Sequence, residues 1–256
     1  MRGVGASLAR LLGLLVIAAL SLQLYFLGRV AAMAWIDPQS TAYQRSEAWR
    51  LATQNGALRW SHEWLPSARI SSNLKRAVIA SEDAGFSEHS GVEWDALEKA
   101  WERNQKAEAA FALRDPQLPQ RPGARLSPAV ARAPKIVGGS TITQQLAKNL
   151  FLGGERSLAR KGQEFVVTTF LEALLSKDRI LEVYLNSVEW GEGVFGAEAA
   201  ARRYFNTGAA TLSAAQAARL AVLLPAPKRF EKRPASAYVL GRAATIMARM
   251  NAVDVP

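Results

Sequence analysis

Residues 77–91, AVIASEDAGFSEHSG, place two acidic side chains at the end of an apolar run. The run from Ala77 to Ala80 has the composition of a buried helix, and Glu82 and Asp83 follow almost directly. A carboxyl group in partly apolar surroundings has a raised pKa and is suited to act as a general base. The simpler interpretation is a solvated turn or a helix cap, which fits Asp83 in particular. The stretch therefore predicts a helix that ends at a candidate catalytic carboxylate, Glu82.

The composition narrows the classes of protein to consider. The 256-residue chain has no cysteine and two histidines, which argues against disulfides, thiolate catalysis and histidine-based metal sites. A formal net charge of +10 favours anionic partners such as lipid headgroups or phosphorylated substrates. A hydrophobic fraction of 49% predicts a packed core. The sequence contains no Walker loop, dinucleotide-binding glycine motif or H-E-x-x-H motif.

An uncharged stretch of 18 residues, 11–28, is long enough to cross a bilayer. Arg2 and Arg10 precede it and Arg29 follows it, a slight bias that favours a cytoplasmic N-terminus and an extracytoplasmic main domain. Residues 32–34, Ala-Met-Ala, resemble a signal-peptidase site, so a cleaved signal peptide is the alternative. The apolar run is longer than a usual signal core, which favours an uncleaved anchor. A domain outside the cytoplasm argues against nucleic acid as a partner.

The remainder of the chain is expected to be mainly helical. Apolar residues recur at helical spacing in four stretches, 72–80, 142–150, 180–188 and 213–224, and strand-like alternation is scarce. Residues 107–137 are rich in proline and arginine and have no apolar period, which predicts a mobile surface loop. The expected divisions are a cytoplasmic N-terminus (1–10), a transmembrane anchor (11–28), a connector (29–70) and one domain (71–256).

A glycine turn leads into a predicted helix in the stretch GGSTITQQLAKNLFL, residues 138–152. Thr141 and Gln144 have the spacing of a capping box. They share a polar face with Gln145 and Lys148, opposite an apolar stripe. A solvated face is the simple interpretation, although two neutral amides and a lysine behind a glycine turn also suit the binding of an anion.

Basic residues gather in the stretch ERSLARKGQEF, residues 155–165. Arg156, Arg160 and Glu164 lie four residues apart and hence on one helical face, with Lys161 beside them. An exposed ladder of ion pairs is the simple interpretation. Together with the lysine of the preceding helix, however, four cations would repel one another unless an anion binds there. Glu164 is expected to stay ionised beside the cations, unlike the carboxylate of the first stretch, and two carboxylates tuned apart indicate divided acid–base roles.

The three stretches, in this order, resemble the peptidoglycan glycosyltransferases that polymerise lipid II, in particular the monofunctional, membrane-anchored biosynthetic transglycosylases. The resemblance runs from about Ser72 to about Phe230. Its motifs are EDAGFSEHSG (82–91), GGSTITQQLAKNLF (138–151), RKGQE (160–164) and KDRILEVYLNSVEWGEGVFGAEAAARRYF (177–205). The resemblance implies a mainly α, lysozyme-like glycosyltransferase domain with a membrane-embedded jaw and a cleft between donor and acceptor sites.

The resemblance also implies roles for the matching residues. Glu82 would deprotonate the 4-hydroxyl of the acceptor N-acetylglucosamine, whose oxygen attacks C1 of the donor N-acetylmuramic acid with inversion and releases undecaprenyl pyrophosphate. Glu164 would be the second essential acid, near the pyrophosphate. The residues that would hold the donor's sugar and diphosphate are Ser140, Gln144, Lys148, Arg156 and Arg160, supported by Thr141, Gln145 and Lys161. The residues that would shape the motifs rather than perform chemistry are Asp83, Phe86, His89, Gly91 and Asn186.

The implied setting is the bacterial cytoplasmic (inner) membrane, with a single-pass anchor and a periplasmic catalytic domain. The implied partners are lipid II, the growing glycan chain, membrane lipid and proteins of cell division or transpeptidation. No cofactor is required by the motifs; stimulation by Mg²⁺ or Mn²⁺ is compatible with a pyrophosphate leaving group, but no metal-ligand motif accompanies it. Residues 107–137 look longer and richer in proline and arginine than in typical members of the family.

Two other functions stay open from the sequence. A lysozyme-like enzyme that cleaves glycan would also use a glutamate of raised pKa, but it would not need a cluster of cations for a diphosphate. A catalytically idle scaffold for cell-wall assembly is the second alternative, and the presence of both Glu82 and Glu164 argues against it.

Overall fold

The computed structural model describes residues 2–54, 59–94, 140–153 and 157–256, together with the single positions 98, 102, 105 and 106. Contacts divide the chain into two units, residues 1–91 with 141–256 and residues 92–140. All the helices and strands below belong to the first unit. The loop predicted at 107–137 lies outside the described residues.

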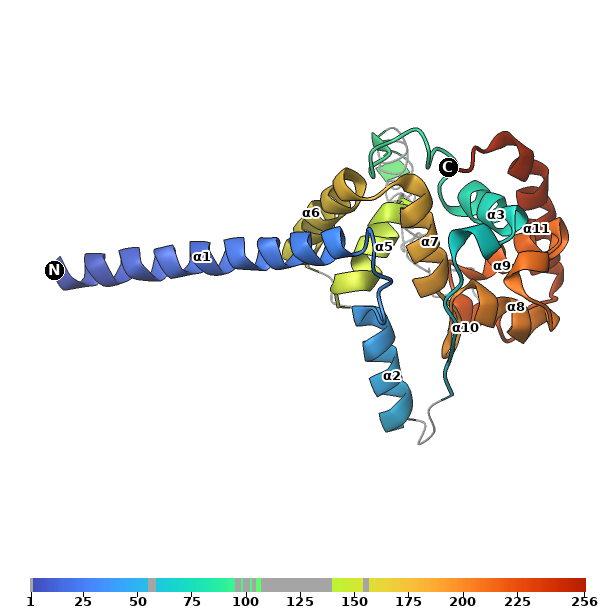
Figure 1. The fold of residues 1–256 in the computed structure, drawn as a ribbon, viewed down its shortest axis with the longest axis horizontal. Helices are drawn as coiled ribbons and strands as arrows, with labels where there is room; N and C mark the ends of the chain where they lie inside the picture. The colour runs from blue at the N-terminus through green and yellow to red at the C-terminus, as the bar shows by residue number, and fades with distance from the viewer. Residues whose placement is uncertain are drawn as a thin grey trace, which may run out of the picture. The chain divides into compact units, whose positions relative to one another are not determined.

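The predicted anchor is part of one long helix, α1 (Arg2–Ala32), shown in Figure 1. Its stretch Ser7–Ala32 is long and apolar enough to cross a membrane, a property that a signal sequence shares. Large apolar side chains along it face outward; Leu14, for example, is 64% exposed. Such a surface suits contact with lipid rather than with water.

The C-terminal half of α1 lies against α6 (Leu158–Leu174). The side-chain amides of Gln23 and Gln163 form a reciprocal pair, with N···O distances of 2.8 and 3.0 Å. The ring of Phe26 also packs edge-on against Phe151. The anchor is therefore attached to the rest of the first unit by polar and aromatic contacts.

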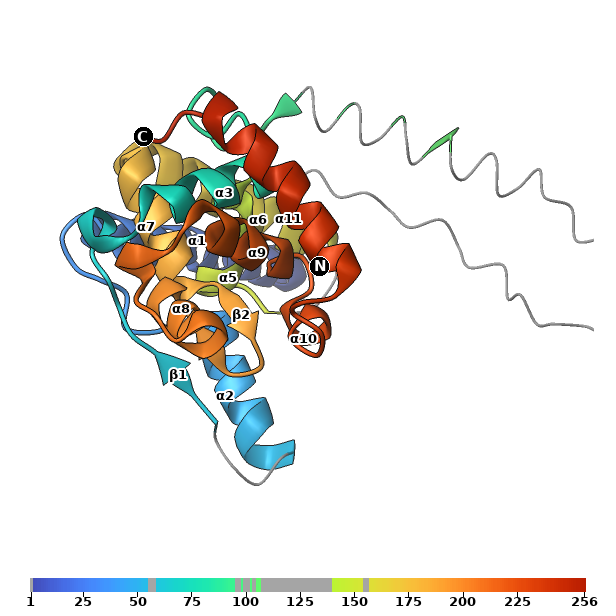
Figure 2. The same ribbon diagram turned by 90° about the vertical axis from the view of Figure 1, so that its right-hand side faces the viewer.

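Two groups of helices form the core. Figure 2 shows α3 (Ser72–Glu82), α9 (Ala214–Leu223) and α11 (Ala237–Arg249) packed side by side. Each begins directly after a serine whose hydroxyl accepts a hydrogen bond from the first helical turn, the preferred N-cap chemistry. The first of these caps is Ser71, one residue before Ser72, the earliest cap expected from the sequence, and α3 ends at Glu82 rather than at Ala80.

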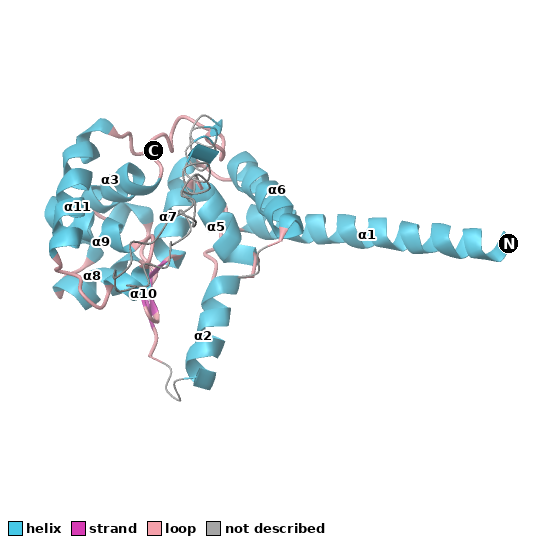
Figure 3. Ribbon diagram, turned by 180° about the vertical axis from the view of Figure 1, so that it is seen from behind, coloured by secondary structure: helices cyan, strands magenta, loops and turns pink. Residues whose placement is uncertain are grey.

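The second group contains α5 (Ile142–Phe151), α6 and α7 (Lys177–Ser187), which lie together in Figure 3. Thr141 and Gln144 form the predicted capping box at the start of α5. The apolar stripe of α5 is buried, and so is most of α7 from Ile180 to Ser187. These helices position the motifs found in the sequence.

A small sheet and short helices complete the first unit. Strands β1 (Ser61–His62) and β3 (Val194–Phe195) pair in parallel, and β2 (Glu189–Gly191) pairs with β3 in the antiparallel sense. Gly193 turns between β2 and β3 with a φ of +71°, and a Cβ atom there would lie 2.0 Å from a backbone oxygen. The remaining elements are α8 (Ala197–Phe205), α10 (Pro227–Phe230), and the 3-10 turns Ser67–Arg69, Ala209–Thr211 and Met250–Ala252.

The connector expected at 29–70 contains a helix, α2 (Ala42–Gln54). The sequence shows no clean apolar period there because few of the helix's side chains are buried. Polar contacts hold α2 instead: Tyr43 donates to Glu189 at 2.6 Å, and Arg50 pairs with Glu192 at 2.8 Å.

Candidate active site

Glu82 is the last residue of α3 and is half-buried. Gln145 Nε2 donates to one of its carboxylate oxygens at 3.0 Å, and the hydroxyl of Tyr184 holds the carbonyl end of the same amide at 2.9 Å. Burial raises the pKa of Glu82 above its ordinary value, and the hydrogen bond from Gln145 opposes this shift. The geometry therefore gives the carboxylate the properties of a general base.

Asp83 joins the first two sequence motifs and is only 4% exposed. One of its oxygens accepts from His89 Nε2 at 2.8 Å, and the other accepts from the backbone N–H of Ile142 at 2.9 Å. The backbone N–H of Gly91 donates to His89 Nδ1 at 3.1 Å, which leaves the ring proton on Nε2. Asp83 and His89 thus fix the end of α3 against the start of α5.

The other residues expected to shape the motifs are also buried at junctions. Gly91 has a φ of +84°, and a Cβ atom there would lie 2.7 Å from Thr168. The ring of Phe86 is buried beneath the ammonium group of Lys177, 4.6 Å from the ring centre. Asn186 hydrogen-bonds both the N–H and the C=O of Leu65, at 2.8 and 2.9 Å, and so fastens the connector to α7.

Glu164 lies on α6 among the predicted cations and is 4% exposed. Arg160 Nη1 donates to one of its oxygens at 3.0 Å, and Lys161 donates to the other. Lys148 is close to this group: desolvation lowers the pKa of its ammonium, Glu164 opposes that shift, and the two neighbouring cations reinforce it. Three cations surround one carboxylate, which leaves the cluster with excess positive charge.

A cleft of about 390 Å³ lies beside these groups. Its walls include Gln145, the residue that holds Glu82, and Arg160, the residue that holds Glu164. Each carboxylate is therefore one hydrogen bond away from a side chain of the wall. The full set of lining residues is Tyr43, Gln145, Lys148, Asn149, Leu152, Gly153, Arg160, Val188, Glu189, Leu224 and Pro227.

Not every predicted binding residue reaches this cleft. Thr141 and Gln144 are buried in the cap of α5, where Thr141 also donates to the carbonyl of Gly91 at 2.6 Å. Ser140 is exposed and is the last residue of the second unit. Arg156 lies outside the described residues.

The structure adds two residues that the sequence did not reveal, Tyr43 and Glu189. Both line the cleft, and Glu189 is 3% exposed. Burial raises the pKa of Glu189, while the hydrogen bond from Tyr43 and the charge of Lys228 oppose the shift. The sequence offered little to mark Glu189, because it stands between Val188 and Trp190 in the stretch NSVEWG, which has no clear periodicity.

The fold and the site define an enzyme with a long apolar N-terminal helix, a raised-pKa glutamate and a cationic cleft. The sequence matches the transglycosylase family over residues 51–111 and 125–251. It is 49% identical over 255 residues to a biosynthetic peptidoglycan transglycosylase of Burkholderia thailandensis, covering 100% of this chain and 90% of that protein. The corresponding protein of Bordetella pertussis is 48% identical over 238 residues, covering 93% and 90%. A third, from Paraburkholderia phytofirmans, is 47% identical over 240 residues, covering 94% and 90%.

The chain therefore belongs to the transglycosylase family, the peptidoglycan glycosyltransferases. This confirms the family and the mainly α, lysozyme-like fold class that the motifs predicted. It also confirms the expected enzyme class, a glycosyltransferase of peptidoglycan biosynthesis. The roles of individual residues remain predictions.

Proposed function

We propose that this cleft polymerises lipid II into β-1,4-linked glycan, with Glu82 as the base. The observation that carries the proposal is the placement of Glu82. It has a raised pKa, and its partner Gln145 lines a cleft whose wall also bears Lys148 and Arg160. A base and a set of cations that share one cleft suit a displacement that begins with a proton transfer and ends with a phosphorylated leaving group.

In the proposed reaction, the Glu82 carboxylate takes the proton of the acceptor's 4-hydroxyl. The oxygen forms a bond to C1 of the donor's N-acetylmuramic acid as the bond from C1 to the diphosphate oxygen breaks. The configuration at C1 inverts, and undecaprenyl pyrophosphate leaves with the electron pair. Lys148 and Arg160 stabilise the negative charge that grows on the diphosphate. One base is sufficient, because a single displacement forms no covalent intermediate with the enzyme.

Glu164 takes a different part in this scheme. Its two oxygens hold Arg160 and Lys161 and so fix the direction in which these cations present their charge. Removing the carboxylate would leave the cations to repel one another. We assign Glu164 to the donor side, where it positions the cations that contact the diphosphate.

In the described part of the site, the carboxylates of Glu82 and Glu164 already have hydrogen-bond partners. The oxygens of Glu164 are occupied by Arg160 and Lys161, and those of Glu82 accept from Gln145 and Ser81. Any stimulation by Mg²⁺ or Mn²⁺ would therefore be expected to act through the substrate's diphosphate, whose oxygens are ligands that both ions accept.

The proposed setting is the surface of the bacterial inner membrane, with α1 as an uncleaved anchor and the cleft on the periplasmic side. The attachment of α1 to α6 supports it, because α6 also exposes Leu158 and Phe165. Apolar side chains next to the anchor suit contact with the outer part of the bilayer. A lipid-linked substrate could then reach the cleft by diffusion in the membrane plane. The expected protein partners are a transpeptidase and components of cell division.

The test is a polymerisation assay with labelled lipid II and detergent-solubilised full-length protein, with products separated by size. Wild type should form polymer, Glu82→Gln should form at least a hundredfold less, and Glu88→Gln, an exposed neighbour of the same type, should match wild type. Shortening of preformed glycan would favour the cleaving enzyme instead. Absence of both activities from all three proteins would favour the scaffold.

A further inference from the structure

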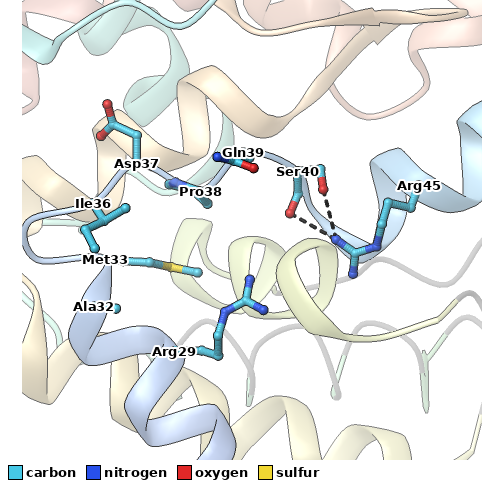
Figure 4. A pocket seen from close by; sticks show the side chains of 9 residues that line it. All are labelled: Arg29, Ala32, Met33, Ile36, Asp37, Pro38, Gln39, Ser40 and Arg45. Carbon is cyan, nitrogen blue, oxygen red and sulfur yellow. Dashed lines mark hydrogen bonds between the residues drawn. The ribbon is translucent and has the colours of Figure 1, made fainter.

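A second pocket lies where the anchor ends, and it shares no lining residue with the cleft. It has a volume of about 310 Å³ and is formed by the end of α1, the segment 33–41 and the first turn of α2. Figure 4 shows Arg29 and Arg45 with their guanidinium groups turned toward the space between these elements. None of its lining residues takes part in the proposed reaction.

The charge of this pocket is not balanced. Within the part of the chain that the structure describes, neither Arg29 nor Arg45 forms an ion pair with a carboxylate. The carboxylate of the pocket, Asp37, is paired with Arg179 at 2.7 Å and points away from the two arginines (Figure 4). Two cations next to one cavity repel each other, and an anion between them would relieve that repulsion.

Helix stability accounts for one arginine and not for the other. Arg29 lies in the last turn of α1, where a cation is favoured by the helix dipole, and it contacts the hydroxyl of Tyr25 at 3.0 Å. Arg45 follows immediately after the first three residues of α2, close to the end of the helix at which an anion is favoured. The hydrogen bonds of Arg45 to Ser40 use Nη1 alone, which leaves donors of its guanidinium for a ligand.

The position along the chain identifies the kind of anion. The uncharged stretch 11–28 ends directly before Arg29, so this arginine lies at the level of the headgroups if α1 spans the bilayer. Trp35 and Ile36 follow and are 85% and 66% exposed. A tryptophan at this depth is typical of the membrane interface.

We propose that this pocket binds the phosphate-bearing headgroup of an anionic phospholipid from the leaflet next to the catalytic unit. The guanidinium groups of Arg29 and Arg45 contact the phosphate, since arginine binds phosphate oxygens through paired N–H donors. The bound lipid fixes segment 33–41 and so the start of α2, which carries Tyr43 of the cleft. The inference rests on the uncleaved anchor of the proposed function and is independent of the reaction itself.

The test uses full-length protein in phosphatidylcholine vesicles that contain spin-labelled phosphatidylglycerol or spin-labelled phosphatidylcholine. The measured quantity is the relative affinity of the two lipids for the protein, from the motionally restricted part of the spectrum. We expect wild type to select phosphatidylglycerol, and each of Arg29→Gln and Arg45→Gln to lose roughly fivefold, the equivalent of about 1 kcal/mol per cation near an anionic lipid. The double variant should lose the selectivity almost entirely.

A matched control removes the same charge elsewhere. Arg69→Gln/Arg203→Gln changes two exposed arginines outside the pocket and should keep the wild-type selectivity. Equal lipid selectivity in wild type, the pocket variant and this control would overturn the proposal. Loss of wild-type selectivity on adding millimolar inorganic phosphate would also overturn it, because the pocket would then be a site for free phosphate. Polymerisation in detergent is measured in parallel, so a failure of the lipid site and a failure of the proposed reaction give different results.

Discussion

The proposed base depends on a chain of three side chains, Tyr184, Gln145 and Glu82. Tyr184 is fully buried, and its hydroxyl orients the amide of Gln145, which in turn donates to Glu82. Burial alone would favour the protonated carboxyl, whereas the amide N–H favours the ionised form. The balance keeps Glu82 basic enough to accept a proton and still able to ionise.

Replacing Gln145 with leucine should move the acid limb of the pH–rate profile to higher pH. The base works only when ionised, so activity is lost as the pH falls through the pKa of Glu82. Removing the hydrogen bond that lowers this pKa raises it further. We also expect kcat/KM at neutral pH to fall roughly tenfold, the size of a hydrogen bond to a charged group. The measurement is the initial rate of lipid II consumption across a pH series.

Tyr184→Phe is the companion variant, since it keeps the amide but removes the group that orients it. Its acid limb should move in the same direction by a smaller amount. An acid limb that stays in place in Gln145→Leu would show that a different group limits the rate at low pH.

At the scale of helices, Asp83 is the main polar connection between α3 and α5. Its two oxygens serve two different elements, the ring of His89 and the N-terminal backbone of α5. Because Glu82 precedes Asp83 and Gln145 lies on α5, this connection also sets the distance between the base and its partner.

Asp83→Ala should lower the free energy of unfolding by about 2–4 kcal/mol, because two buried donors lose their acceptor. Asp83→Asn keeps one oxygen acceptor and should lose about half as much. The measurement is the urea midpoint of helical circular dichroism for the detergent-solubilised protein. A midpoint of Asp83→Ala equal to that of Asp254→Ala, a change at an exposed aspartate, would mean that the connection contributes nothing to stability.

The helices could be predicted from the sequence where burial imposes a period. The apolar spacing of α5 and α7 predicts both helices, and the serine and threonine caps mark where helices begin. α2 could not be predicted in this way, because ion pairs and the hydrogen bond from Tyr43 hold it rather than an apolar face.

The residues of the candidate site differ in the same way: some belong to a local sequence pattern and could be predicted, and others do not. Glu82, Glu164 and the cations near Glu164 belong to motifs whose local spacing is visible in the chain. Tyr43 and Glu189 meet across 146 positions of sequence, and no local pattern marks such a pair. For Gln144 the local pattern was ambiguous, because its spacing fits both a capping box and a binding face. The structure places it in the cap.

At the scale of the whole first unit, the anchor and the candidate active site are far apart in sequence but connected in space, because Gln23 and Gln163 are 140 positions apart. Gln23 lies within the apolar stretch of α1 and pairs with Gln163, the residue directly before Glu164. An amide pair in an apolar setting is retained because either amide alone would lose its partners. The position of α6 is thereby tied to the position of α1.

Polymerisation in vesicles should depend on the length of the lipid acyl chains. The 18 uncharged residues 11–28 span about 27 Å as a helix. The rate should be highest where the hydrocarbon thickness is close to this value and should fall several-fold in much thicker bilayers, where the anchor is too short. Gln23→Leu should flatten this dependence, because α6 is then no longer tied to the anchor.

The control for Gln23→Leu is Leu22→Ala, which adds no polar group to the anchor. It changes an exposed apolar neighbour and should leave the dependence as in wild type. An identical thickness profile for Gln23→Leu and wild type would show that the amide pair does not couple the two helices.

The pairing of Gln23 with Gln163 has a consequence for how such an enzyme is distributed in a cell. If the anchor transmits its depth to the carboxylate one residue away, the local composition of the bilayer becomes a control on wall growth. Regions whose lipids match the anchor would extend glycan faster than regions that are too thick, without any change in the amount of protein. The thickness of the membrane would then regulate the rate of the enzyme through the single pair of amides, Gln23 and Gln163.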